Sequence, residues 1–345
     1  MSRALKVLCV LLLTLPFATQ AFAIAGATDR KPAASLLVPF LETGIDVATN
    51  PQDTLLVVTS TWIFPVTIHY HVWDIDGNPT ALYGNIALGS TWSTAMRDQL
   101  NASTPAVRAQ LTDGAFYRGF VTIDLVTAAT SLNPRQAGYP FDNSNFLEGQ
   151  IYYTRLSQGS ANGLAMVPIE SVNPATFTVL QGFYTGGDGR EEIDSTARVC
   201  TQTLSETGIC EIGGEDADID RFHLRIFRST PLNGSSRAVV FTWIQGETGG
   251  PSVYCDANPC ASDYLFRQYN EAGSFVQDTT IRLDHVVNLI PNSALLGAEA
   301  GYVSIWDVPN CKLDTQVYAF SFNSANPVAN PSLTWDAIFE GFIVP

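Results

Sequence analysis

Apolar and polar residues alternate with a period of two along much of this chain, and no other feature limits its possible folds as strongly. Such runs cover residues 66–73, 121–125 and 222–226. Period two is the repeat of a β-strand, whose side chains point to opposite faces in turn. Helical periodicity is nearly absent outside residues 94–111, and Pro105 interrupts even that stretch. The pattern therefore predicts an all-β protein.

Turn sequences separate the predicted strands. Asp76-Gly77-Asn78-Pro79, Asn162-Gly163 and Asn233-Gly234 are combinations that favour tight turns. Many short strands joined by such turns are typical of a sandwich or barrel. Antiparallel sheets must bury one face, so we expect two stacked antiparallel sheets in each domain.

A weak internal repeat suggests two such domains. Residues 119–123 (GFVTI) resemble 301–305 (GYVSI), and 150–152 (QIY) resemble 316–318 (QVY). Residues 55–59 and 238–242 form a third match, and all the matches run in the same order along the chain. Short strands also resemble one another by composition alone, which is the competing explanation. A true repeat predicts β-sandwich domains over about 30–172 and 221–345.

The segment between these domains, residues 173–220, has a different composition. Ten acidic residues lie between Phe183 and Asp220, against Arg190 and Arg198. Gly and Thr are frequent there, and the segment contains Cys200 and Cys210. We expect a long acidic loop or linker closed by a disulfide.

The first 23 residues predict export. Arg3 and Lys6 precede a short apolar run from Val7 to Leu15, and Ala21-Phe22-Ala23 has the small-x-small pattern of a cleavage site. The run is well short of the ~20 residues that span a bilayer, and no later segment is apolar enough to do so. The sequence therefore predicts a secreted or periplasmic protein without a membrane span.

The charge is strongly acidic. The chain has 18 Lys and Arg against 33 Asp and Glu, a net charge of −15. Removing Arg3 and Lys6 with the signal peptide leaves 16 against 33, or −17. Nucleic acids and anionic membrane surfaces require a basic patch, so this balance argues against both as partners.

Five cysteines remain after cleavage, and none belongs to a C-x-x-C pair. Zinc-ribbon and thioredoxin-like sites are therefore not expected. In an oxidising compartment near neighbours pair, which predicts the disulfides Cys200–Cys210 and Cys255–Cys260 with Cys311 unpaired.

The first half resembles a group of uncharacterised secreted bacterial β-rich proteins. The resemblance rests on Leu36-Leu37-Val38-Pro39, which matches an opening "LLVP" strand, and on the turn that begins at Trp73-Asp74. It extends over residues 54–77, 119–126 and 146–171, and more loosely into the second half. The group has no assigned activity, so the resemblance implies no catalytic residues.

Two places could hold a metal ion. His69 and His71 project from one face of a strand and could chelate a transition metal if Asp74 or a neighbouring strand supplied a third ligand. The alternative is a solvent-facing polar side of that strand. Asp216, Asp218 and Asp220 present alternate carboxylates that could bind calcium, or could simply be solvated. Asp74 to Asn78 lacks the closing Glu of a calcium loop and is expected to be a hairpin turn.

No local motif indicates catalysis. G-x-S-x-G, H-E-x-x-H and phosphate-binding glycine motifs are all missing from the sequence, although a Ser-His-Asp arrangement assembled by the fold remains open. Six tryptophans could form a platform for sugars or could lie in the core: Trp62, Trp73, Trp92, Trp243, Trp306 and Trp335.

Two hypotheses about function follow. The first is a non-catalytic binding or surface-structural protein that meets an extracellular ligand or surface. The second is a secreted, glycan-directed hydrolase whose carboxylate pair comes from separate loops, which would leave no local motif. We expect the first, with no cofactor.

Overall fold

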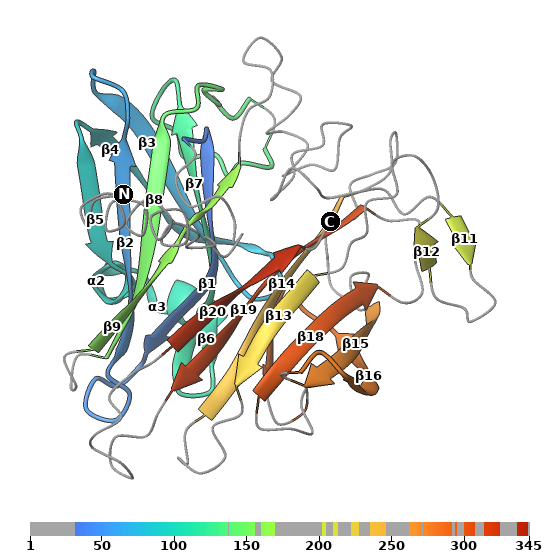
Figure 1. The fold of residues 1–345 in the computed structure, drawn as a ribbon. Coiled ribbons are helices and arrows are strands. Elements are labelled where there is room, and N and C mark those ends of the chain that lie inside the picture. The colour runs from blue at the N-terminus through green and yellow to red at the C-terminus, as the bar shows by residue number, and fades with distance from the viewer. Residues whose placement is uncertain are drawn as a thin grey trace, which may run out of the picture.

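The computed structural model describes residues 32–136, 138–155 and 160–169 of the first half of the chain. In the second half it describes residues 202–204, 210–212, 222–227, 235–245, 262–270, 272–291, 294, 300–307, 314–324 and 337–343. These parts are mainly antiparallel strands, with two short helices (Figure 1). The all-β prediction is confirmed. The predicted signal peptide lies outside the described residues.

A six-stranded sheet forms one layer of the first half. Its strand order is β10-β1-β7-β3-β4, with β6 paired to β7. The strands are β1 (Ser35–Gly44), β3 (Val66–Trp73), β4 (Pro79–Leu88), β6 (Thr112–Asp113), β7 (Phe116–Val126) and β10 (Val167–Ile169). β1 is buried along its whole length, which explains why residues 36–41 read as a nearly continuous apolar run.

A four-stranded sheet forms the facing layer, in the order β5-β2-β8-β9. Its strands are β2 (Gln52–Ser60), β5 (Thr91–Ala95), β8 (Leu147–Arg155) and β9 (Ser160–Ala165). Only Met166 separates β9 from β10, so the chain passes almost directly from one sheet to the other. Ile68 and Val72 of the first sheet and Val58 of the second belong to one buried core. The rings of Tyr70 and Trp92 stack across it at 5.5 Å. The first half is therefore a β-sandwich.

Two helices follow β5 where a single interrupted helix was expected over residues 94–111. They are α2 (Met96–Ala102) and α3 (Pro105–Leu111). Pro105 begins α3 and the Thr104 side chain caps it, because proline fits the first helical position, where no backbone donor is needed. Leu100 and Leu111 carry the apolar faces of these helices into the core.

The described strands of the second half form one continuous eight-stranded sheet, in the order β16-β15-β18-β13-β20-β19-β14-β17. These strands are β13 (Phe222–Phe227), β14 (Ser235–Gln245), β15 (Ser262–Asn270), β16 (Phe275–Leu283), β17 (Val287–Pro291), β18 (Ala300–Asp307), β19 (Asp314–Ser324) and β20 (Ala337–Ile343). β20 pairs with both β13 and β19, and so joins what would otherwise be two sheets. The acidic segment expected to be a loop or linker contains a paired hairpin, β11 (Gln202–Leu204) and β12 (Cys210–Ile212).

The two halves share one succession of strands. β4-β3-β7-β1-β10 in the first half has the same order as β16-β15-β18-β13-β20 in the second, and β5-β2-β8-β9 the same order as β17-β14-β19-β20. Val121 on β7 lies opposite Val38 and Val72, and Val303 on β18 lies opposite Leu224 and Gln268.

The turn after β3 also has a counterpart after β15. Asp74 N–H donates to Asn78 O, and Gly77 N–H donates to Asp74 O. Asn270 N–H donates to Ser274 O in the same way, and Gly273 N–H donates to Asn270 O. Gly77 and Gly273 both have positive φ, at 82° and 76°.

The second half packs against the outer face of the six-stranded sheet. Phe241 on β14 meets Phe120 on β7 edge to face at 5.2 Å. Val287 N–H donates to Ile75 O at 3.1 Å, and the Asp76 carboxylate meets the His285 ring. The six-stranded sheet is therefore covered on both faces.

Candidate functional site

The two histidines proposed as metal ligands lie on the covered face of β3. Their rings point to the same side, as predicted, with centroids 6.1 Å apart. Both are buried: His69 is 0% exposed and His71 is 3% exposed. The Tyr83 ring stacks beside both of them, and Tyr139 meets His69 edge to face. The expectation of a solvent-facing polar side is therefore wrong for this strand, because residues distant in sequence cover it.

The surroundings of these rings favour neutral imidazole. The pKa of His71 is lowered to about 3, chiefly by burial and also by the nearby His69 and Arg135. Burial also lowers the pKa of His69, although its hydrogen bond with Asn85 acts in the opposite direction. Within the described residues, both ring nitrogens of His71 and Nε2 of His69 have no hydrogen-bond partner.

Asp74, the suggested third ligand, is already engaged. Its Oδ1 accepts from the backbone N–H groups of Asp76 and Asn78, and its Oδ2 accepts from Gln110. It therefore closes the hairpin turn, as expected for Asp74 to Asn78. Across the part of the chain that the structure describes, no three His, Cys, Asp or Glu side chains gather to hold a metal ion.

Ser35, His69 and Asp124 come together on the same covered face without forming a hydrolytic triad. The Ser35 hydroxyl donates to Asp124 Oδ1 and the Tyr139 hydroxyl donates to Oδ2, while His69 Nδ1 faces Asn85. A nucleophilic serine needs the imidazole as its base. Ser35 is bonded to the carboxylate instead, and all three residues of the set are fully buried.

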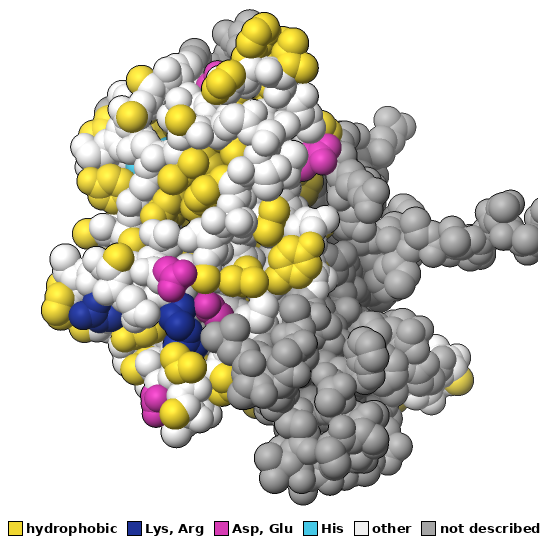
Figure 2. All heavy atoms as spheres, turned by 90° about the vertical axis from the view of Figure 1, so that its left-hand side faces the viewer, with side chains coloured by type: hydrophobic (Ala, Val, Ile, Leu, Met, Phe, Trp, Pro, Cys, Tyr) yellow, Lys and Arg dark blue, Asp and Glu magenta, His cyan; other side chains and the backbone are white. Residues whose placement is uncertain are grey.

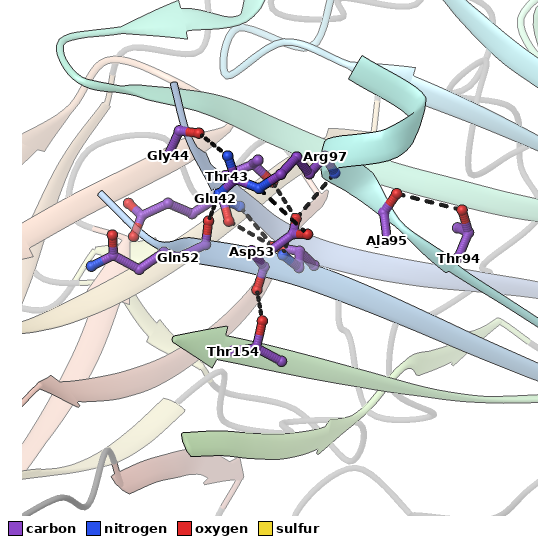
Figure 3. A network of polar contacts seen from close by, with 10 residues as sticks. Glu42, Thr43, Gly44, Gln52, Asp53, Thr94, Ala95, Arg97 and Thr154 are labelled. Atoms are coloured by element: carbon purple, nitrogen blue, oxygen red, sulfur yellow. Dashed lines mark hydrogen bonds and ion pairs between the residues drawn. The ribbon is translucent and has the colours of Figure 1, made fainter. Parts of the chain in front are cut away.

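A polar network closes the end of the sandwich where β2 begins (Figure 3). The Asp53 carboxylate accepts from Thr43 Oγ1 at 3.0 Å, Thr54 N–H at 2.8 Å and Arg97 N–H at 3.1 Å. The Arg97 guanidinium donates to Gly44 O and Gln52 O. Burial raises the pKa of Asp53, and these hydrogen bonds with the Arg97 charge act in the opposite direction.

Glu42 lies beside this network and pairs with a different arginine. Arg118 Nε donates to the Glu42 carboxylate at 2.9 Å, and Arg118 also pairs with Asp113. Arg118 lies on β7, in the same sheet as Glu42, so β1 and β2 are joined instead by the Thr43–Asp53 hydrogen bond and by Arg97, which donates to Gly44 O and Gln52 O. These contacts tie the two sheets together.

The opposite end of the sandwich exposes large apolar side chains. The β2–β3 connection carries Trp62, Ile63 and Phe64, which are 44%, 82% and 58% exposed. Phe146, directly before β8, packs beside this connection. We call these four residues the aromatic end. In Figure 1 the β2–β3 connection lies at the top of the molecule, and Figure 2 shows hydrophobic side chains gathered there, with an acidic side chain beside them and no Lys or Arg at that end in this view.

The aromatic end is held in a fixed shape. Trp62 stacks on Phe146 with ring centroids 4.7 Å apart and planes 16° from parallel, and Phe64 packs against Trp62 at 5.9 Å. Thr61 N–H donates to Phe146 O, and Trp62 N–H donates to Ser60 Oγ. The exposed rings are therefore preorganised by the strands beneath them.

The chain segments around the aromatic end contain no Lys or Arg. Residues 59–65 and 89–91 contain neither acidic nor basic side chains, whereas the acidic Asp142 and Glu148 flank residues 143–147, and Glu148 lies opposite Thr59. These segments are joined by hydrogen bonds, including Ser60 N–H to Ser90 O and Thr61 N–H to Phe146 O. The charged residues that flank these segments are therefore acidic, like the chain as a whole with its net charge of −15.

Several predicted site residues cannot be placed. Asp216, Asp218 and Asp220 lie outside the described residues, as do Cys200, Cys255, Cys260 and Cys311. The calcium and disulfide predictions therefore remain predictions. Of the tryptophans, Trp73 is buried, Trp92 is half-buried and Trp62 is exposed. Sequence reasoning named Trp62 only as one of six; the informative signal was three large apolar residues between two strands, followed by Pro65.

Comparisons with known proteins give only weak structural similarities. No protein-family model matches the sequence, and no curated protein matches it. The chain is similar to a β-glucuronidase of Parabacteroides merdae at 9% identity and a TM-score of 0.15, covering 88% of this chain and 27% of that one. It is similar to procruciferin, an 11S globulin of Brassica napus, at 11% identity and a TM-score of 0.17, covering 85% and 73%. The chain thus spans about a quarter of the glucuronidase. At these TM-scores neither similarity bears on function.

Proposed function

We propose that this is an exported binding protein that uses the aromatic end to meet its ligand or surface and carries out no chemistry of its own. The observation that carries the proposal is the exposure of Trp62, Ile63 and Phe64 on a loop fixed by stacking and hydrogen bonds. The export signal predicted in residues 1–23 supports a secreted or periplasmic location.

An exposed apolar surface that is held rigid favours aggregation unless a partner binds to it. Contiguous apolar patches on soluble proteins usually mark interaction sites, since they favour aggregation otherwise. A preorganised loop loses little conformational freedom when it binds, which favours affinity. Both arguments apply to the aromatic end, where the rings keep their positions without a partner.

The described buried carboxylates support a non-catalytic role. Glu42 and Asp53 are paired with Arg118 and Arg97, and Asp124 accepts from Ser35 and Tyr139. A general acid or base must reach a substrate and keep a proton site available for it. These three side chains are turned inward and already hydrogen-bonded.

The shared strand order supports a further part of the proposal, that the halves are repeats of one sandwich unit. The repeats would differ at the functional position. In the first half residues 61–65 join β2 to β3, whereas residues 246–261 join β14 to β15 and contain no run of three large apolar residues. Binding through the aromatic end would therefore belong to the first half alone.

The test is a binding and turnover screen of the purified exported protein. Chitin, cellulose, peptidoglycan and phosphatidylcholine vesicles serve as probes, alongside glycoside, ester and peptide substrates. We expect sedimentation with at least one probe, weakened in the Trp62→Ser/Phe64→Ser variant, and no turnover. Turnover that disappears on replacing one Asp, Glu or His would contradict the proposal, as would binding that ignores the variant.

A further inference from the structure

We infer that the aromatic end binds the surface of a lipid bilayer with zwitterionic headgroups. The inference rests on the proposed function and names its partner. It draws on two observations: the chemistry of the loop tip, and the lack of basic side chains in the chain around it.

The loop tip suits an acyl environment better than a sugar. Ile63 is the most exposed large apolar side chain of the described residues, at 82%, and it has no ring face on which a sugar could stack. Trp62 and Phe64 flank it, and their rings are of the kinds that settle at the boundary between headgroups and acyl chains. Pro65 leaves the loop without a backbone donor at its last position.

Charge selects among membranes. The segments around the loop contain no Lys or Arg and are flanked by the acidic Asp142 and Glu148, so an anionic headgroup meets no basic partner there, whereas a zwitterionic headgroup also presents a cation. The net charge of −15 would repel an anionic bilayer at long range, with the repulsion screened by salt. A zwitterionic surface avoids that repulsion.

The experiment is co-sedimentation of the exported protein, with signal removal checked by mass spectrometry, on phosphatidylcholine vesicles. Because each apolar side chain contributes on the scale of its buried area, we expect Trp62→Ser/Ile63→Ser/Phe64→Ser to lower the partition coefficient about tenfold or more. Ile63→Ser alone should lower it measurably with an unchanged melting temperature, since that side chain is mostly exposed. Vesicles containing phosphatidylglycerol should bind less protein at low salt.

The matched control is Phe275→Ser/Val276→Ser, which removes exposed apolar side chains from β16. It should leave the partition coefficient within about twofold, since single apolar residues elsewhere on a surface are ordinary. Equal losses in both variants would overturn the inference, as would no vesicle binding by the wild type. Loop-dependent binding to a polysaccharide, or a dimer that the loop variant dissociates, would overturn the bilayer but leave the proposed binding function standing.

Discussion

His71 lies in an aromatic interior that accepts a neutral imidazole and disfavours an imidazolium. Tyr83 and Trp73 flank its ring, and Arg135 lies close enough to oppose a second positive charge. Asp124 faces this side of the sheet, but Ser35 and Tyr139 already donate to it. The folded protein therefore disfavours protonation of His71. As a result, its free energy of unfolding should fall as the pH is lowered.

We predict that His71→Phe reduces the acid sensitivity of folding. The pKa of His71 is about 3 in the folded protein against 6.5 as its ordinary value. Below pH 6.5 the unfolded chain binds a proton that the folded protein excludes, so stability is full above pH 6.5 and falls toward pH 3. Between pH 6.5 and 5 this loss is about 2 kcal/mol, and the variant should lack it.

Urea unfolding at pH 7.5 and at pH 5 measures this difference. At pH 7.5 the variant should be close to the wild type, because neither ring nitrogen of His71 has a hydrogen-bond partner to lose. The same fall in the free energy of unfolding in both proteins would show that His71 does not carry the acid sensitivity.

Asp53 differs from His71 in that its buried side chain has several hydrogen-bond partners. We predict that Asp53→Ala lowers the free energy of unfolding by about 2–4 kcal/mol, because it leaves Thr43, Thr54 and Arg97 donors without their acceptor. Asp53→Asn should cost less, about 1 kcal/mol, since it keeps an acceptor oxygen and removes a charge that burial disfavours.

The control for Asp53 is Asp113→Ala. Asp113 also pairs with an arginine, but its side chain is 45% exposed, and exposed pairs contribute at most about 1 kcal/mol. Equal losses for Asp53→Ala and Asp113→Ala in chemical denaturation would show that the buried network is not what closes this end of the sandwich.

At the scale of elements, alternation in the sequence predicted where the strands lie, but it did not predict which of their faces are buried. Residues 66–73 were predicted as a strand with one apolar and one polar side, and β3 has these bounds. Yet the polar side is buried, because Tyr139 and Arg135, from the connection between β7 and β8, lie over His69 and Trp73. Such covering depends on contacts between distant residues, which periodicity does not contain.

At the aromatic end, periodicity in the sequence likewise failed to predict the surroundings, but here the residues are exposed rather than buried. Large apolar residues at 62–64 could equally have continued a buried strand, since composition does not distinguish a core from a loop. Their exposure follows from where β2 ends at Ser60 and β3 begins at Val66. The carboxylate partners were also invisible in the sequence, because Arg97 and Asp53 lie on different elements.

The corresponding turns after β3 and β15 give a prediction at this scale. Gly77 and Gly273 both adopt the left-handed region, where a Cβ costs roughly 1–2 kcal/mol. A Cβ on Gly77 would also lie 3.0 Å from Val286 Cγ2, whereas one on Gly273 would meet nothing within 4 Å. We therefore predict that Gly77→Ala destabilises the protein more than Gly273→Ala.

Thermal or urea unfolding of the two variants decides this prediction. The difference between them isolates the contact with Val286, because the backbone strain is common to both. If Gly273→Ala is the more damaging variant, the turn of the first half does not pack against the second half as described.

At the scale of the whole molecule, the face covered by the second half, the Asp53 network and the aromatic end lie in different parts of the structure. The second half packs on one face of the six-stranded sheet through Phe241 and Val287, while Tyr83 and Tyr139 of the first half lie against the histidine pair on that face. The Asp53 network closes one end of the first sandwich. The aromatic end occupies the other. None of the helices that the structure describes is long and apolar enough to cross a membrane.

The central claim is that the aromatic end is the surface through which this protein binds, and that it enters a bilayer interface. The most direct measurement is quenching of tryptophan fluorescence by phosphatidylcholine brominated on its acyl chains, comparing the wild type with Trp62→Phe. Because phenylalanine keeps the apolar contact, the variant should still bind vesicles. We predict quenching in the wild type and its loss in the bound variant. Quenching that persists without Trp62, or bound wild-type protein that is not quenched, would contradict the account.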